Sequence, residues 1–326
     1  MGIELTIIDP FDKKAFIPTT EEGVIWSTER RCVPARLSFN VLSDGSFKLR
    51  EGAAVSFKVN GKPVFYGYLF EQRHDQKGRI SLTAYDQLRY LRNRDTFVYE
   101  NRTASQLVKM LAEDLNLQTG TVEDTGFTIA SRIEENSTFS DIIENALEIT
   151  SENTGEMFVL YDDFGKLTLK NISSMRAGEP GKYLLIGPDS GEGYEYGSSI
   201  DKDVYNRVKL IRNNGKTGGR DIFIAEDNKS IAAWGLLQYT GKVSDAENGK
   251  DKAQRLLQLY NGKSRSLKIK NVFGDVRVRG GSMVMVNFNP GNFKIRNFML
   301  TEKAVHIFKN NEHFMELTLR GGDTNG

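Results

Sequence analysis

The chain has 326 residues, of which 39% are hydrophobic and 27% charged, and its formal net charge is +1. This length suggests two or three domains, and the composition is ordinary for a soluble globular protein. A net charge this close to zero gives no electrostatic basis for binding nucleic acid. No segment approaches the roughly 20 consecutive apolar residues that a membrane span needs.

Charge is distributed unevenly along the chain. Residues 1–95 contain 15 basic residues (Lys or Arg) and 12 acidic residues (Asp or Glu). Residues 96–175 contain 5 basic and 14 acidic residues, and residues 176–326 contain 24 and 17. The net values of these segments are therefore +3, −9 and +7. A change of composition on both sides of a middle segment is typical of an inserted domain. We therefore expect three domains, at residues 1–95, 96–178 and 179–326.

Residues 1–95 are predicted to form a small β-barrel domain. Short runs with mostly alternating apolar residues stand at 35–41, 53–59, 63–71 and 79–85. Turn signals separate these runs, at 43–45 (SDG), 60–62 (NGK) and 76–78 (QKG). Asn60-Gly61 between two apolar runs is a strong hairpin signal, because both residues tolerate a positive φ.

Residues 96–178 are predicted to form an acidic α+β domain. Thr103 followed by Gln106 is a capping-box pattern in front of a helical apolar stripe. A second helix is predicted over 137–150 from apolar residues at helical spacing. Two strands are predicted after it, on either side of Asp162 and Asp163.

Residues 179–326 are predicted to form a second β-barrel domain with one long helix near 247–261. Strand-like runs stand on both sides of this helix, at 205–211, 221–226, 266–272, 276–278, 282–288, 298–308 and 313–319. The glycine-rich stretches at 187–197 and 213–220 are predicted to be loops, because neither has the context of a phosphate-binding loop. The second stretch is a candidate interaction arm.

Two stretches of the predicted barrels share a pattern. Residues 52–71 and 281–302 each show a glycine, an alternating strand ending in Asn, a tight turn and another strand. Any two β-hairpins can share such a pattern, so it leaves open whether the two barrels are related. The fold class expected from the whole chain is mixed α+β and mainly β, with two related small β-barrels and an inserted α+β domain.

Two of the three histidines, His306 and His313, stand close to a carboxylate, Glu312, near the end of the chain. A two-residue turn at 310–311 would place both histidines on one face of a hairpin, with Phe308 opposite His313. Their closeness raises the possibility of a metal or catalytic site.

A shared metal would need a third or fourth ligand at recognisable spacing. Glu312 would lie on the opposite face of the hairpin, while His74 and Cys32 are distant in sequence. We therefore expect a structural hairpin, with no metal and no cofactor. His306→Ala combined with His313→Ala should then remove stability but no activity.

The remaining chemistry-bearing residues form no recognisable catalytic set. The chain has no G-x-S-x-G elbow. Arginines beside Cys32 could lower its thiol pKa, but no histidine stands in a recognisable context with it, which favours a core or strand-end cysteine. Asp162 and Asp163 would face opposite sides of a strand and are more typical of a hairpin turn than of a glycosidase pair.

Cys32 is the only cysteine, so an internal disulfide is impossible and folding in a reducing cytoplasm is expected. The first residues, MGIELTIIDPFDKK, lack the basic and apolar regions of a secretory signal.

Several stretches, in a specific order and covering about residues 20–322, resemble the baseplate hub family of contractile phage tails, in particular the hubs of PBSX-type prophages. These in turn look like distant relatives of other tail hubs and of the N-terminal part of type VI secretion spikes. The stretches are 25–27 with 67–72 and 82–93, 100–111 with 137–169, 203–211, and 252–286 with 304–322. Thr28 departs from the pattern, since a turn glycine is expected after Trp26-Ser27.

The resemblance implies a structural protein and no enzyme. In this family three subunits form a ring, and each contributes two similar barrels, so that six barrels surround a channel. Such a pseudo-six-fold ring joins the hexameric tail tube to the three-fold central spike. A balanced charge suits a channel that DNA must traverse, because a strongly basic lumen would hold phosphate.

The partners implied by the resemblance are two further copies of the chain, the tail tube protein, the central spike or tip protein, other baseplate proteins and, as a further candidate, the tape measure protein. Specific nucleic-acid binding and membrane insertion are not expected. The implied location is the baseplate of a virion or phage-like particle, with synthesis in the bacterial cytoplasm.

Two other functions are alternative hypotheses. A tail-associated cell-wall hydrolase, either a glycosidase or a peptidase, is the main alternative. A carbohydrate-binding β module would display a cluster of exposed aromatic residues, and the chain has two tryptophans, Trp26 and Trp234.

Overall fold

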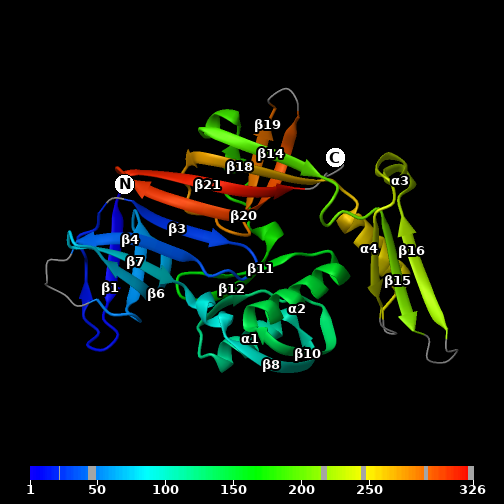
Figure 1. Ribbon diagram of the computed structural model, residues 1–326, viewed down its shortest axis with the longest axis horizontal. Helices are drawn as coiled ribbons and strands as arrows, with labels where there is room; N and C mark the ends of the chain where they lie inside the picture. Colours follow the sequence, from blue (N-terminus) through cyan, green and yellow to red (C-terminus); the bar gives the residue numbers. More distant parts are fainter. Residues whose placement is uncertain (22, 43–48, 214–218, 244–246, 290–292, 322–326) are drawn as a thin grey trace.

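The computed structural model describes residues 1–21, 23–42, 49–213, 219–243, 247–289 and 293–321. Strands predominate, and thirteen of those described belong to one large sheet (Figure 1). Eleven of them follow one path, in the spatial order β14 (Gly193–Ser199), β18 (Ser264–Phe273), β21 (Glu312–Gly321), β20 (Ile295–Lys309), β3 (Val24–Glu29), β4 (Arg36–Leu42), β7 (Arg79–Tyr85), β6 (Lys62–His74), β5 (Ala54–Val59), β1 (Ile3–Ile8) and β2 (Ala15–Phe16). β19 (Met283–Phe288) pairs with β20, and β13 (Leu185–Ile186) pairs with β19.

The mainly β character with mixed α+β parts is therefore confirmed. Alternating apolar residues explain why these segments form strands with one buried face; in β4, Leu37, Phe39 and Val41 are buried and their neighbours are not. The path of paired strands is open at both ends, and no sheet of the described residues closes on itself.

The large sheet consists of two halves with the same strand order. The first half runs β3-β4-β7-β6-β5-β1, and the second runs β14-β18-β21-β20-β19-β13. Each half has its own hydrophobic core. One difference lies at the last strand, because β1 is antiparallel to β5 whereas β13 is parallel to β19.

The two halves also share backbone details. The N–H of Gly52 donates to the carbonyl of Leu69, and the N–H of Gly281 donates to the carbonyl of Thr301, at 2.7 and 2.8 Å. Both glycines have a positive φ, at 84° and 93°. The register slips by one residue directly after Leu69 and directly after Thr301, which marks a β-bulge at the same place. The pattern shared by 52–71 and 281–302 is thus a true correspondence in the fold.

A separate α+β unit follows the first half and lies below the large sheet in Figure 1. It contains α1 (Ala104–Asp114), α2 (Phe139–Thr154), the ribbon of β8 (Arg94–Thr103) and β10 (Thr128–Thr138), and the sheet of β9 (Thr119–Val122), β11 (Phe158–Asp162) and β12 (Leu167–Asn171). The capping box of Thr103 and Gln106 is confirmed, and α2 ends at Gly155, whose φ of 79° is left-handed.

A second small unit lies at the far right of Figure 1, beside the large sheet. It contains β15 (Arg207–Asn213), β16 (Arg220–Glu226), β17 (Gln238–Lys242), α3 (Asn228–Trp234) and α4 (Gly249–Tyr260) around its own core. The strands expected at 205–211 and 221–226 and the helix near 247–261 are present. These strands, however, form their own three-stranded sheet and do not belong to the large one. Three short 3₁₀ helices complete the described elements, at Gln87–Arg92, Ile172–Ser174 and Pro188–Ser190.

Two local predictions were wrong. Residues 276–278 form a turn, not a strand, and much of the loop expected at 187–197 is strand β14. Thr28, which departs from the turn glycine of the family pattern, is a buried residue of β3, and its hydroxyl accepts a hydrogen bond from the N–H of Gly280. The turn predicted at 43–45 and most of the interaction arm predicted at 213–220 lie outside the described residues.

Candidate functional site

The histidine hairpin has the register expected from the sequence. Phe308 pairs with His313, and His306 pairs with Met315, around a turn whose two asparagines have φ of 53° and 59°. The Nδ1 atom of His306 lies 2.9 Å from the Nε2 atom of His313. The Nε2 atom of His306 lies 2.9 Å from the carbonyl oxygen of Val278, which can only accept, so this nitrogen carries the proton. His306 Nδ1 then accepts from His313.

Both ring nitrogens of His306 are thus used by hydrogen bonds within the protein. Burial, together with the neighbouring His313, lowers the pKa of His306 to about 3, and burial lowers the pKa of His313 to about 4. At neutral pH both rings are uncharged. Within the described residues, no group of three or more His, Cys, Asp or Glu side chains is arranged to hold a metal ion. The arrangement is that of a buried hydrogen-bonded core.

The other candidate residues lie apart from this hairpin. Cys32 is fully buried, as expected for a core cysteine, and its burial and the carboxylate of Glu144 raise its thiol pKa. Asp162 is buried at the end of β11, and Asp163 is exposed in the turn that follows, so the two face different surroundings. His74 is exposed at the end of β6.

A buried polar cluster joins the two sheet halves to the inserted unit. Arg279 donates to the backbone carbonyl of Asp162 at 2.9 Å and stacks over the ring of Tyr161 at 3.9 Å. Gln87 donates to the carboxylate of Asp162 at 2.9 Å. Burial raises the pKa of Asp86 and of Asp162, and the charge of Asp162 raises that of Asp86 further. Sequence patterns give no signal for this cluster, because its members come from three distant segments.

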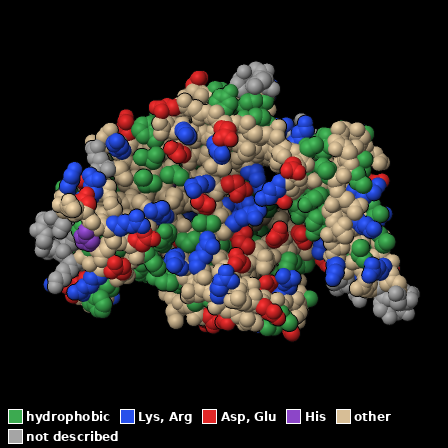
Figure 2. All heavy atoms as spheres, viewed as in Figure 1, with side chains coloured by type: hydrophobic (Ala, Val, Ile, Leu, Met, Phe, Trp, Pro, Cys, Tyr) green, Lys and Arg blue, Asp and Glu red, His purple; other side chains and the backbone are tan. Residues whose placement is uncertain are grey.

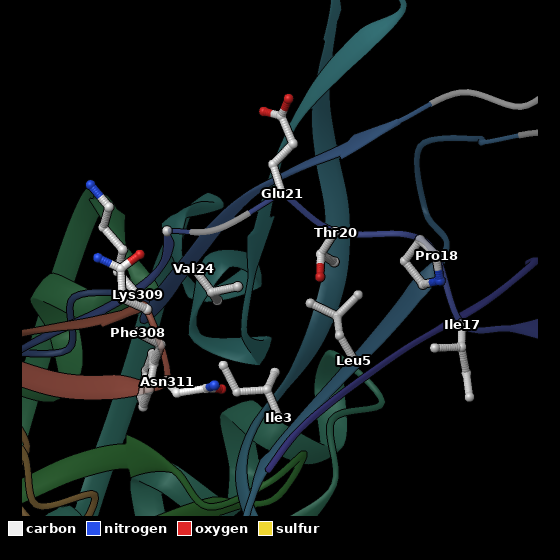
Figure 3. A pocket seen from close by; sticks show the side chains of 12 residues that line it. Ile3, Leu5, Ile17, Pro18, Thr20, Glu21, Val24, Phe308, Lys309 and Asn311 are labelled. Carbon is white, nitrogen blue, oxygen red and sulfur yellow. The ribbon is translucent and has the colours of Figure 1, made fainter. Parts of the chain in front are cut away.

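A small cavity of about 180 Å³ lies between the first strand and the strand that joins the halves (Figure 3). Ile3 and Leu5 of β1 face Phe308 of β20 across it, whereas Glu21 and Lys309 point outward at its rim. Val24, at the start of β3, also lines this cavity, so β1 and β3 at the two ends of the first half-sheet both border it. This lining holds no recognisable nucleophile and base pair, and it has the character of a packing seam.

The junction between the two halves is a paired strand edge. Strands β3 and β20 pair antiparallel over six residue pairs, from Lys303 opposite Glu29 to Phe308 opposite Val24. Trp26 and His306 stand opposite each other with ring centroids 4.5 Å apart.

Ion pairs flank the junction. Arg30 donates from two nitrogens to the two carboxylate oxygens of Glu302, both at 3.0 Å, and the Lys303 ammonium lies 2.7 Å from Glu29. Bidentate geometry of this kind adds orientation as well as energy. One half of the sheet thus pairs with the other through a strand edge, a tilted pair of aromatic rings and charged side chains.

Acidic and basic side chains are interspersed on the face shown in Figure 2, in keeping with the balanced net charge. In the parts of the chain that the structure describes, none of the helices is long and apolar enough to cross a membrane.

Comparison with known proteins now identifies the family. The family model described as YQBQ-like matches residues 24–320. The chain belongs to the YQBQ-like family. The protein YqbQ of Bacillus subtilis strain 168 is 30% identical over 97% of this chain and 95% of its own. The phage-like element PBSX protein XkdQ of the same organism is 32% identical over 83% of this chain and 82% of its own. The resemblance to PBSX-type hub proteins drawn from the sequence is confirmed.

Solved structures share the fold of this YQBQ-like chain at low sequence identity. The prophage MuSo2 43 kDa tail protein from Shewanella oneidensis is 12% identical with a TM-score of 0.65, and 97% of each chain is covered. The E. coli c3393 protein is 11% identical with a TM-score of 0.58, covering 99% of this chain and 77% of its own. That protein is described as a type VI secretion component with structural similarity to the T4 phage tail proteins gp27 and gp5.

Proposed function

We propose that this YQBQ-like chain is the structural baseplate hub of a contractile phage tail or phage-like particle. Three copies form a ring with pseudo-six-fold symmetry that joins the hexameric tail tube to the central spike. The observation that carries this proposal is the duplicated half-sheet, with its repeated strand order, glycine hydrogen bonds and bulges. Three chains with two such halves each supply six related units, which is what a junction between six-fold and three-fold parts requires.

The domain organisation follows from the same proposal. Residues 1–95 and 179–326 hold the two related barrel domains, each completed by curling of its half-sheet, and residues 96–178 form the inserted α+β domain. The cavity between β1 and β20 supports such curling in the first half. The unit around α4 is an addition within the third domain.

The proposed partners are two further copies of the chain, the tail tube protein, the spike or tip protein, other baseplate proteins and the tape measure protein. Relatedness to XkdQ of a phage-like element and a shared fold with a tail protein support this set and a location in the tail baseplate after synthesis in the host cytoplasm. The mechanism is symmetry matching by a closed heterologous ring, without catalysis, metal or cofactor.

Light scattering tests the ring. We expect a mass of three times 36.7 kDa for the chain, alone or when it is produced together with its cognate tube protein. A monomer under both conditions contradicts the proposal.

A peptidoglycan zymogram tests the competing cell-wall hydrolase. We expect no band of lysis from the purified protein, since the candidate residues that the structure describes form no catalytic arrangement. A band of lysis that survives repurification would replace the structural proposal with an enzymatic one.

A further inference from the structure

The two halves of the large sheet each present a strand edge that could receive a neighbour. Strand β14 is the end of the path of paired strands in the second half. In the first half, β5 pairs with β6 over Lys62–Tyr68, so residues 71–74 of β6 pair with β7 alone among the described strands. An unpaired strand edge exposes N–H and C=O groups that favour pairing with another strand.

The internal repeat relates these edges to the junction inside the chain. Matching Leu69 to Thr301 places residues 71–74 of β6 on 303–306 of β20, because the bulge follows at the same step in both. The same match makes Leu37 of β4 correspond to Leu267 of β18. Trp26 pairs with Leu37, and Tyr196 pairs with Leu267, so Trp26 corresponds to Tyr196 in the repeat. Strand β14 therefore corresponds to β3, and the end of β6 corresponds to the part of β20 that β3 covers.

We propose that β14 of one copy pairs antiparallel with residues 71–74 of β6 in a second copy of this chain, in the register of the internal β3–β20 junction. The proposal rests on the ring proposed above and names its contact. The register places four residue pairs across the contact: Glu71 with Ser199, Gln72 with Ser198, Arg73 with Gly197 and His74 with Tyr196. Each copy donates one edge and receives another, so the contact is head-to-tail, and three such contacts close into the proposed ring when each rotates the chain by a third of a turn.

The side chains at the two edges fit this register. His74 and Tyr196 occupy the positions of His306 and Trp26, the buried His–aromatic pair of the internal junction. His74 is exposed in the single chain, and the proposed contact would bury its imidazole as His306 is already buried. The same side-chain types at matched positions favour the same mode of pairing.

The flanking positions differ in chemistry but remain compatible. Where Arg30 and Glu302 form an ion pair in the internal junction, the matched residues are Ile200 and Phe70, which are both apolar and partly buried. Glu51 stands where Gly280 has no side chain, so β14 must lie slightly farther from this loop than β3 does.

Disulfide trapping tests the register. In an antiparallel pair, opposite Cβ atoms lie about 4.5–5.5 Å apart, close to the separation that a disulfide bridges. Gln72→Cys with Ser198→Cys should give, on oxidation, a covalent species of three times 36.7 kDa that is lost on reduction. Arg73→Cys with Ser198→Cys is the control, because these side chains face opposite sides of the sheet. Thr28→Cys with Ala304→Cys, the matched pair inside the chain, should close without change of mass.

Mixing the single variants tests the head-to-tail arrangement. Gln72→Cys chains mixed with Ser198→Cys chains should give covalent dimers, and neither variant alone should give any. A trimer by light scattering in which Gln72→Cys with Ser198→Cys forms no more cross-link than the control overturns this pairing and leaves the ring intact. A chain that stays monomeric even with its tube protein, and forms no cross-link, overturns the ring and the pairing together.

Discussion

Phe308 offers the sharpest test of how the two halves depend on each other. It belongs to β20 of the second half, yet its ring is 1% exposed and packs in the core of the first half. There it meets Phe57 edge-on at 5.1 Å and stacks on His313 at 4.3 Å. Phe308→Ala removes this contact while leaving the backbone pairing with β3 in place.

The expected loss follows from the buried area. Burying a phenylalanine removes about 150–250 Å² from water, and at about 25 cal/mol per Å² this contributes roughly 4–6 kcal/mol, part of which alanine retains. Measured Phe→Ala changes in cores cost about 3–5 kcal/mol. We therefore expect Phe308→Ala to lower the free energy of unfolding of the first half by about 3–5 kcal/mol.

Urea unfolding followed by tryptophan fluorescence measures this loss, because Trp26 lies in β3 beside the substituted strand. Phe273→Ala is the matched control; its ring is 72% exposed, so we expect a change within about 0.5 kcal/mol. A loss below about 1 kcal/mol for Phe308→Ala would show that the end of β20 is not part of the first core, and would refute the reasoning.

Three further predictions concern buried groups. The pKa of His306 is lowered to about 3, so the neutral ring stabilises the fold above the unfolded pKa of about 6.5, and this stability is lost as the pH falls toward the folded value. His306→Gln should therefore reduce the slope of unfolding free energy against pH by about 1.4 kcal/mol per unit between about pH 5.5 and 4, and an unchanged slope would contradict it. Gly280→Ala should cost about 1–3 kcal/mol in urea unfolding, since its Cβ would meet the backbone of Glu29, whereas Gly193→Ala, with open space around it, should be neutral; equal effects would argue against the close approach. The buried thiol of Cys32, whose pKa is raised by burial, should react with Ellman's reagent only after denaturation, and rapid reaction of the native protein would refute its burial.

Local patterns predicted the parts of this fold that depend on neighbouring residues. The Asn60-Gly61 turn, the hairpin turn at 310–311 and the capping box at Thr103 all have the expected geometry. Each is decided within about ten residues by φ preferences and by side-chain hydrogen bonds to nearby backbone. The pairing of His306 with Met315 followed from the turn alone.

The errors arose where the same local pattern fits two tertiary settings. Residues 205–211 alternate like a strand of the large sheet, but they pair with β16 and β17 in a small sheet of their own. Residues 276–278 also alternate, but they belong to a turn, in which the carbonyl of Val278 contacts His306. Alternating apolar residues indicate a strand with one buried face, but they do not identify the strand with which it pairs.

The sequence by itself determined that this chain is mainly β, that it carries a separate acidic α+β unit, and that it resembles a phage hub, because composition, period and residue order are properties of the chain. Only the tertiary structure decided that β3 and β20 pair although they are far apart in the sequence, that Arg279 donates to Asp162, and that both ring nitrogens of His306 form hydrogen bonds. These contacts bring together segments that are separate in the sequence, and burial then sets the protonation of the titratable groups among them. Neither effect is encoded in any single stretch of residues.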